Sequence, residues 1–102
     1  MAIVNATLAL TNTDVFTASQ ETAVTLVYLC NTSASAITIQ FHAVPNGDLV
    51  NDSNKIYHDL SIPAGDTYIL EQERLILENG DKLTGSASTA AEVSVTVSYK
   101  TI

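Results

Sequence analysis

Apolar and polar residues alternate along most of the chain, and this period of two predicts β-strands. The pattern is clearest in residues 36–44, where apolar side chains fall on every second position, and in residues 92–100, where valine alternates with serine and threonine. Each of these segments has one apolar face for a core and one polar face. No window of about 11 residues shows the 3.6-residue spacing of an amphipathic helix.

Residues 22–30 differ from the other segments because both of their faces are apolar. Leu26, Tyr28 and Cys30 lie on one side, and the residues between them on the other side are valine and leucine. A run of this kind is typical of a central strand, or of a strand whose outer face is covered by a partner. We therefore expect this segment either to lie in the middle of a sheet or to have its outer face covered by a partner.

Turn signals separate the predicted strands at short intervals. Pro63-Ala64-Gly65-Asp66 has proline and glycine where a type II turn prefers them. Glu78-Asn79-Gly80-Asp81 is a second strong turn, and a long polar loop begins at Pro45. Between these turns we expect further short strands at residues 55–60, 67–72 and 82–87, and one or two more over residues 6–10 and 15–18.

This spacing of short strands and turns predicts an all-β fold. We expect one domain over residues 1–102, a single antiparallel β-sandwich of seven to eight strands. Periodicity does not choose between a jelly-roll and an immunoglobulin-like order of strands. The Cys-Trp-Cys pattern of antibody domains is absent from the sequence, which has one cysteine and no tryptophan.

The charge balance argues against nucleic acid and membrane as partners. Four basic residues face eleven acidic ones, for a formal charge of −7, and the basic residues are scattered along the sequence. A surface that follows phosphates needs clustered lysine and arginine. The sequence also shows neither a basic secretory leader nor an apolar stretch long enough to cross a bilayer. We expect synthesis in a cytoplasm and a protein without nucleic-acid or membrane contacts.

Hydroxyl groups, more than charges, make up the polar faces of the predicted strands. The chain holds 13 threonines and 9 serines, while charged residues are 15% of the sequence. Hydroxyls keep a surface soluble and are cheaper to desolvate than charges. We therefore expect this domain to associate with copies of itself, with other proteins, or with both. The partner contacts expected on outward strand positions are Thr38, Gln40, Ser94, Thr96 and Ser98.

Catalytic residues are not recognisable in the sequence. The Gly-x-Ser-x-Gly elbow of many hydrolases is missing. His58 and Asp59 are neighbours on one predicted strand, so their side chains should point to opposite faces. We expect His42 and His58 to be partly exposed strand residues without a catalytic role. The sequence thus predicts a non-enzyme that has no catalytic site and no cofactor.

The sequence also gives only weak signals for a metal site or for a site built on paired carboxylates. The single Cys30 cannot form an intramolecular disulfide, and we expect it to be a small buried apolar residue. Glu71 and Glu73 share one face of a predicted strand, and we expect a solvated acidic edge there. The polar loop over residues 46–54 is rich in oxygen ligands but lacks the residue order of a calcium loop. No metal ligand is therefore assigned, and calcium in this loop stays an open alternative.

Several turn and strand segments between Thr22 and Ser98 together form a recognisable pattern. They are Leu29-Cys30-Asn31-Thr32-Ser33-Ala34-Ser35-Ala36 with the strand ending at Val44-Pro45, Leu60-Ser61-Ile62-Pro63-Ala64-Gly65-Asp66-Thr67-Tyr68, Leu77-Glu78-Asn79-Gly80-Asp81-Lys82-Leu83, Ala87 and Val95-Thr96-Val97-Ser98. In these segments the chain resembles small β-sandwich structural proteins of tailed bacteriophage virions. The resemblance implies a structural virion component, assembled in the host cytoplasm and bound to capsid, neck or tail proteins. It offers no catalytic or ligand motif.

Two functional classes follow from this resemblance. The first is a capsid decoration protein or a neck or tail-associated subunit that binds other virion proteins. The alternative is a tail-fibre or baseplate module that contacts glycans on the host surface. Sugar stacking would need exposed aromatic side chains, and the four tyrosines are the candidates. We expect Tyr28 and Tyr99 to belong to the core, which leaves Tyr57 and Tyr68.

Overall fold

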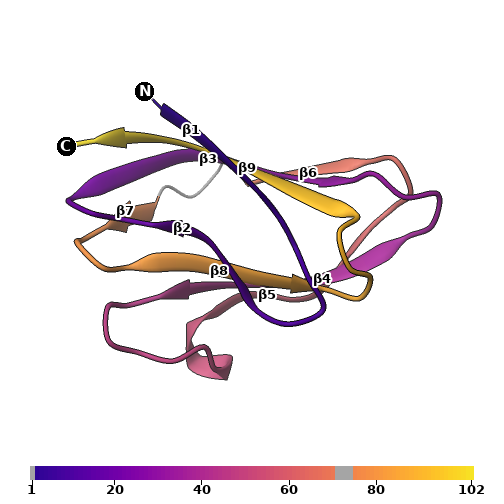
Figure 1. Ribbon diagram of the computed structural model, residues 1–102, viewed down its shortest axis with the longest axis horizontal. Coiled ribbons are helices and arrows are strands. Elements are labelled where there is room, and N and C mark those ends of the chain that lie inside the picture. The colour runs from indigo at the N-terminus through magenta and orange to yellow at the C-terminus, as the bar shows by residue number, and fades with distance from the viewer. Residues whose placement is uncertain (1, 71–74) are drawn as a thin grey trace.

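The computed structural model describes residues 2–70 and 75–102, which form two layers of β-strands (Figure 1). The strands alternate between buried and exposed positions as the sequence pattern predicts for a sandwich. A single turn of 3₁₀-helix, η1 (Asp52–Asn54), follows the polar loop after the fourth strand. The strands are β1 (Ala2–Thr7), β2 (Thr13–Thr17), β3 (Thr22–Asn31), β4 (Ile37–Val44), β5 (Lys55–Ile62), β6 (Thr67–Leu70), β7 (Leu75–Leu77), β8 (Lys82–Ala87) and β9 (Val93–Thr101).

The strands form two antiparallel sheets, so the predicted all-β sandwich is confirmed. One sheet has the order β1-β9-β3-β6, with β7 also pairing with β3, and is the upper layer in Figure 1. We call it the β9 sheet. The other has the order β2-β8-β4-β5 and is called the β8 sheet. β3 is central in its sheet, as the two-sided apolar run of this strand predicts.

The order of the strands decides between the two topologies that the sequence left open. β1 pairs with β9, β2 with β8, β3 with β6 and β7, and β4 with β5. Each strand of the first half of the chain therefore pairs with its counterpart in the second half, like a long hairpin wound over two sheets. This nested order is that of a jelly roll, and it excludes the immunoglobulin-like alternative.

Nine strands are present in the described part of the chain, more than the seven to eight expected. β6 and β7 pair with consecutive stretches of β3, residues 27–30 and 22–24, and so share one strand position. The expected strand over residues 67–72 ends at Leu70 in the described range, and its last two residues lie outside it. The first strand is Ala2–Thr7, so it begins earlier than the expected segment 6–10 and ends before residues 8–10.

The core lies between the two sheets and is built from the inward positions of both. Val27 and Leu29 of β3 face Ile39 and Phe41 of β4 across this core, and all four are at most 1% exposed. Every apolar residue buried here stabilises the fold by about 1.5 to 3 kcal/mol. The inner valines of β9, predicted from the alternation, are fully buried: Val93, Val95 and Val97.

The two strong turns of the sequence take the expected geometry. Gly65 has a φ of +71°, and the amide of Asp66 donates to the Pro63 carbonyl at 3.1 Å. A positive φ at the third residue is what a type II turn requires. Gly80 has a φ of +90° in the corresponding position of the second turn, where Asp81 N donates to Glu78 O at 3.0 Å.

Candidate functional site

The five predicted partner contacts lie on two opposite surfaces of the sandwich. Thr38 and Gln40 belong to β4 and face outward from the β8 sheet. Ser94, Thr96 and Ser98 belong to β9 and alternate with its buried valines, so they face outward from the β9 sheet. The structure therefore keeps each group together but separates the two groups by the thickness of the core. They cannot contribute to one site.

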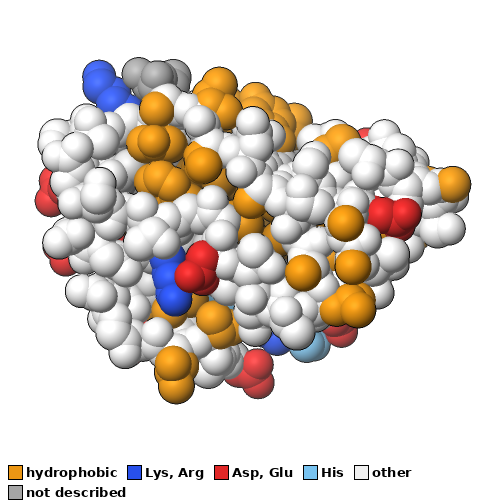
Figure 2. Space-filling view, in the orientation of Figure 1, with side chains coloured by type: hydrophobic (Ala, Val, Ile, Leu, Met, Phe, Trp, Pro, Cys, Tyr) orange, Lys and Arg blue, Asp and Glu red, His pale blue; other side chains and the backbone are white. Residues whose placement is uncertain are grey.

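The outer surface of the β9 sheet, here called the β9 face, combines hydroxyls with apolar side chains. The serines and threonine of β9 run down its middle, flanked by the outward residues of β3 and β1. Ile3, Ile69 and Ile76 are 68%, 44% and 57% exposed on it. Figure 2 shows hydrophobic side chains along the top of the molecule, over this sheet. The β9 face consists of Ile3, Asn5, Thr7, Leu26, Tyr28, Cys30, Ile69, Ile76, Ser94, Thr96 and Ser98.

Hydrogen bonds between neighbouring strands hold these hydroxyls in place. The Thr96 hydroxyl donates to Asn5 Oδ1 at 2.9 Å. The Thr25 hydroxyl lies 2.9 Å from the Ser98 carbonyl oxygen and 3.0 Å from its Oγ. Side chains that are already ordered lose less conformational entropy when a partner covers them. The β9 face is thus both flat and preorganised.

The strands of the β9 sheet carry no carboxylate in their described residues. Asp14 of β2 and Asp59 of β5 are on the other sheet, and the remaining described acids lie in turns, loops and η1. Lys100, near the end of β9, is the one charged residue on a described strand of this sheet. The cores of protein interfaces are depleted of charge in the same way. The acidic residues in the described part of the chain are therefore placed away from the strands of the β9 sheet.

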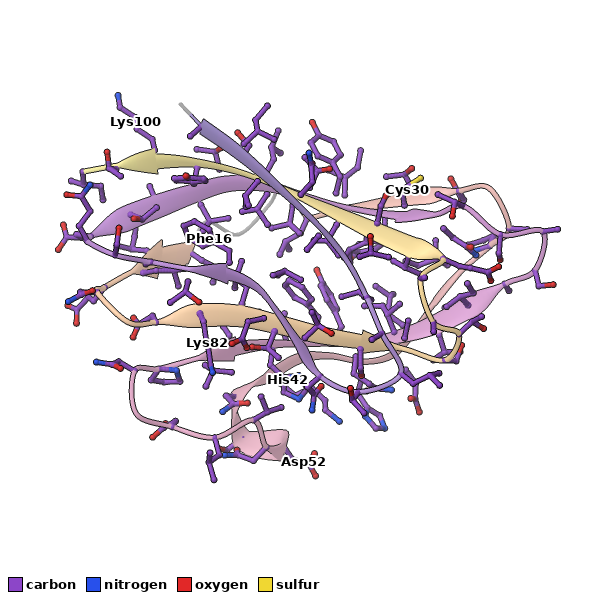
Figure 3. All side chains as sticks on the ribbon, viewed as in Figure 1. Phe16, Cys30, His42, Asp52, Lys82 and Lys100 are labelled. Atoms are coloured by element: carbon purple, nitrogen blue, oxygen red, sulfur yellow. The ribbon has the colours of Figure 1, made fainter. Side chains whose placement is uncertain are left out.

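Two residues of the β9 face were expected in the core and are not there. Tyr28 and Cys30 alternate with the buried Val27 and Leu29 and are half-buried on the outer side of β3. Figure 3 shows the Cys30 sulfur on the outer side of the upper sheet. The alternation correctly puts Tyr28 and Cys30 on the side opposite to Val27 and Leu29. The prediction that Tyr28 and Cys30 belong to the core is wrong. Tyr99 does pack inward, with its ring 4.5 Å from that of Phe16.

The outer surface of the β8 sheet contains an open depression of about 530 Å³. Thr38 and Gln40 of β4 line it together with Asp59 of β5 and Ser86 and Ser88 around the end of β8. These side chains supply hydroxyl, amide and carboxylate groups, but no aromatic ring lines the depression. It can make hydrogen bonds to a polar molecule, and it offers no surface on which a sugar ring would stack.

A bulge in β5 shapes this depression. Asp59 has a φ of +52°, and the pairing of β4 with β5 shifts register between Ile39 and Phe41. The Gln40 side chain clamps the bulge, because its Nε2 donates to the Asp59 carboxylate and its Oε1 accepts from the Asp59 amide at 3.1 Å. Left-handed backbone is tolerated by aspartate better than by most residues.

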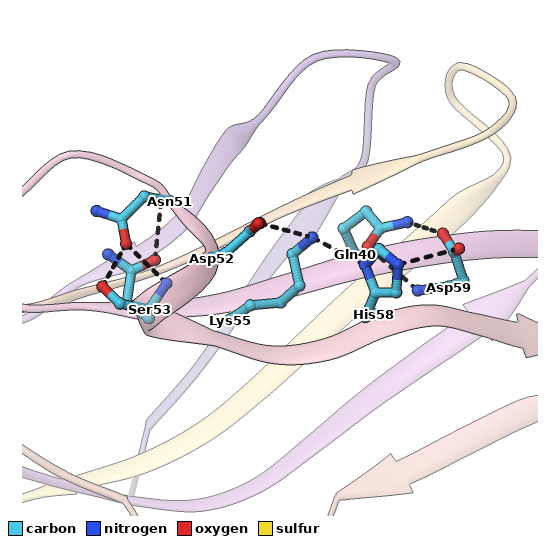
Figure 4. Close-up of polar contacts among 8 residues, drawn as sticks. Gln40, Asn51, Asp52, Ser53, Lys55, His58 and Asp59 are labelled. Atoms are coloured by element: carbon cyan, nitrogen blue, oxygen red, sulfur yellow. Dashed lines mark hydrogen bonds and ion pairs between the residues drawn. The ribbon is translucent and has the colours of Figure 1, made fainter.

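The same bulge overturns the prediction that His58 and Asp59 point to opposite faces. His58 Nε2 lies 3.3 Å from Asp59 Oδ2, because the left-handed residue breaks the alternation of side chains (Figure 4). Lys55 Nζ lies 2.9 Å from His58 Nδ1 and 3.4 Å from Asp52 Oδ1. The ammonium donates to Nδ1, which leaves the proton of neutral His58 on Nε2. Both ring nitrogens are thus engaged, and neither is directed at a nucleophile.

His42 is the second histidine whose surroundings differ from the prediction. It was expected on a partly exposed face, but it is only 4% exposed on β4, beside the loop that carries η1. Burial lowers the pKa of His42 below its ordinary value of 6.5, and the positive charge of Lys55 adds to this effect. Its Nδ1 is buried without a hydrogen-bond partner in the described residues.

The structure offers no metal centre in its described part. Groups of three or more His, Cys, Asp or Glu residues close enough to hold an ion are not found there. In the polar loop, Asn51 Oδ1 accepts from the Ser53 amide at 2.8 Å and Asn54 Oδ1 from the Asn51 amide at 3.1 Å, so these oxygens cap η1. The acidic pair expected at Glu71 and Glu73 lies outside the described residues.

Comparisons with known proteins give no relative: no family model, no curated protein and no solved structure matches this chain. Among the described residues there is also no helix with the length and hydrophobicity of a membrane span. The β9 face and the depression on the β8 sheet are therefore the two candidate sites, and both are judged on their chemistry.

Proposed function

We propose that this protein is a non-enzymatic structural subunit that packs its β9 face against another protein of an assembly. The observation that carries the proposal is the absence of carboxylates from the described strands of this sheet, in a chain with a formal charge of −7. Charges that must be desolvated oppose association, whereas hydroxyls and isolated apolar side chains oppose it little. The exposed isoleucines and half-buried Tyr28 supply apolar contact area.

The assembly that we propose is the virion of a tailed bacteriophage, with this protein as a capsid decoration or a neck or tail-associated subunit. The sequence resemblance supports this choice, and the jelly-roll order is one that viral capsid domains use. A fold by itself does not assign a function, so the proposal depends on the β9 face and on the resemblance together. The partners are other virion proteins and copies of the same chain.

In this proposal the acidic residues act through long-range electrostatic repulsion and do not touch a partner. Nine acids belong to the described residues, and they lie on the β8 sheet or in turns, loops and η1. Their repulsion opposes contacts between copies through the acidic surfaces and turns the uncharged side toward a partner. It also keeps the protein away from the negatively charged genome during assembly.

A single added carboxylate tests the proposal. Thr96→Glu places a negative charge in the middle of the β9 face, and we expect it to reduce incorporation into virions by about tenfold or more. Ser61→Glu adds the same charge to an exposed position on the β8 sheet and is the matched control. Quantitative mass spectrometry of purified particles gives the copy number of each variant. Equal incorporation of both variants and the wild type would rule out the β9 face as the docking surface.

The alternative function, contact with host-surface glycans, has the depression on the β8 sheet in its favour. Its convergent hydroxyl, amide and carboxylate groups suit a polyhydroxy ligand. The remaining tyrosines do not add a stacking surface, because Tyr57 packs edge-on against Tyr68 at 5.3 Å. A glycan array distinguishes the two functions: specific binding that is lost in Gln40→Ala would favour the receptor-binding module.

A further inference from the structure

The edges of the two sheets differ in how well they are protected against pairing with another strand. Edge strands expose unpaired backbone groups, and natural proteins guard them with bulges, charges, proline or short length. β2 has a register shift and carries Asp14. β5 has two register shifts and carries Lys55 and Asp59. Within the residues that the structure describes, β6 and β7 span only four and three residues.

β1 has none of these protections. Its six residues, Ala2–Thr7, pair with β9 in continuous register without a shift. The strand contains neither charged residues nor proline, and Ile3 is 68% exposed. Within residues 2–70 and 75–102, β1 pairs with β9 alone, so its other side is open. Of the edge strands, β1 is therefore the one most suited to accept a further strand.

The register shows which backbone groups lie on the open side. The amide of Leu8, the residue after β1, donates to the Val93 carbonyl at 2.9 Å, so Leu8 has the orientation of a residue that bonds to β9. Hydrogen-bonded and non-hydrogen-bonded pairs alternate along an antiparallel ladder. Val4 and Ala6 consequently bond to β9, while the amides and carbonyls of Ile3, Asn5 and Thr7 point to the open side. The side chains of these three residues lie on the β9 face.

We propose that β1 pairs antiparallel with β1 of a second copy of this chain, about a two-fold axis that passes beside Asn5. In this register Ile3 lies opposite the partner's Thr7, and Asn5 lies opposite the partner's Asn5. All three outward residues of β1 then form hydrogen-bonded pairs, and each pair exchanges both of its backbone hydrogen bonds. If the two-fold axis lay elsewhere along β1, some amides and carbonyls of Ile3, Asn5 and Thr7 would have no partner.

Three observations favour a second copy as the occupant of this edge. β1 and the neighbouring described strand β9 bring no like charges together, since Lys100 is at one end of β9 and Glu92 is just before the other. Antiparallel pairing aligns the Lys100 end of one copy with the Glu92 end of its partner. Asn5 Oδ1 already accepts from Thr96, and the Asn5 Nδ2 group donates to no atom in the described chain, so it is available on the axis.

Pairing of two copies through β1 would also enlarge the β9 face. Opposed residues of a hydrogen-bonded pair project to the same side of a sheet. The two β9 sheets therefore join into one continuous sheet, with both β9 faces on the same side. The dimer presents a docking surface twice as wide as that of one subunit. The pairing itself depends only on β1 and does not require the proposed virion role.

Proline substitution at the edge tests the pairing. The Asn5 backbone amide points away from β9, so Asn5→Pro removes a backbone donor of the dimer and leaves the backbone hydrogen bonds of β1 to β9 in place, although the side-chain bond from Thr96 to Asn5 is lost. We expect sedimentation equilibrium to show a concentration-dependent dimer for the wild type and a dissociation constant raised at least about tenfold for Asn5→Pro. Thr17→Pro is the matched control, because its amide points off the edge of β2, next to the pair of Ala18 with Asp81. The control should dimerise like the wild type.

Amide hydrogen exchange on the unmodified protein gives a second readout that does not depend on a variant folding. With rising protein concentration, the amides of Ile3, Asn5 and Thr7 should gain protection, while those of Val4 and Ala6 should change little. A wild type that stays monomeric at millimolar concentration would overturn the proposal. So would a dimer that survives Asn5→Pro, or one whose exchange pattern lacks this alternation. None of these results would bear on the docking of the β9 face to virion proteins.

Discussion

At the scale of single residues, Asp59 shapes the outer surface of the β8 sheet through the bulge in β5. Its left-handed backbone and the register shift bring the side chains of His58 and Asp59 within 3.3 Å of each other. Gln40, which clamps the bulge, belongs to β4 and lies 19 positions earlier in the sequence. The arrangement therefore depends on the pairing of β5 with β4, and the local alternation of residues does not contain it.

His42 is a residue whose buried position gives a testable pH dependence. The folded chain resists protonation of His42 because burial and Lys55 lower its pKa, while the Thr84 backbone and Asp52 oppose this only in part. In the unfolded chain the same group binds a proton as the pH falls through about 6.5. The contribution of His42 to stability is therefore complete above this pH and is lost as the pH falls toward its folded pKa.

We expect the free energy of unfolding of the wild type to fall below pH 6.5, with a slope from this residue of at most about 1.4 kcal/mol per pH unit. Urea denaturation between pH 7.5 and pH 5 measures it. His42→Gln should flatten the curve in this range, and His58→Gln, which removes the exposed histidine, should keep most of the slope. An unchanged curve for His42→Gln would show that His42 does not carry the effect.

At the scale of the strands, the sequence predicted those elements whose alternation is plain. The segments over residues 36–44 and 92–100 appear as β4 and β9 with the expected inner residues. The sequence predicts the first strand at residues 6–10, whereas β1 is Ala2–Thr7. Alanine at positions 2 and 6 is only weakly apolar, so its alternation with Ile3 and Asn5 is difficult to recognise. The sheet order and the separation of the five candidate residues onto two surfaces were not predictable, since both arise from pairings between distant strands.

β3 has two apolar sides, and we expect one to stabilise the core and the other to contact a partner. Leu29 is fully buried in the core, whereas Leu26 is half-buried on the β9 face. Leu29→Ala should reduce the free energy of unfolding by about 2 to 5 kcal/mol. Leu26→Ala should reduce it by less than about 1 kcal/mol but lower incorporation into virions. Chemical denaturation and particle composition measure the two effects, and a large loss of stability in Leu26→Ala would place that side in the core.

At the scale of the whole molecule, the distribution of charge gives the sandwich two different sides. The β9 sheet is free of carboxylates in its described strands, and the described acids lie on the β8 sheet and around the loops. The composition predicts a protein built to associate, and the three-dimensional arrangement is the basis for our proposal that it does so through the β9 face. The strand order that creates this separation brings β1, β3 and β9 together from both ends of the chain.

Cryo-electron microscopy of purified virions is the decisive measurement for the proposed docking of the β9 face. We expect copies of the sandwich on the head, neck or tail, oriented so that Thr96 and the outer side of β3 meet another virion protein. The β8 sheet, with its acids, would face solvent. Virions without any copy of the chain, or copies bound through the β8 sheet with the β9 face exposed, would overturn the proposal.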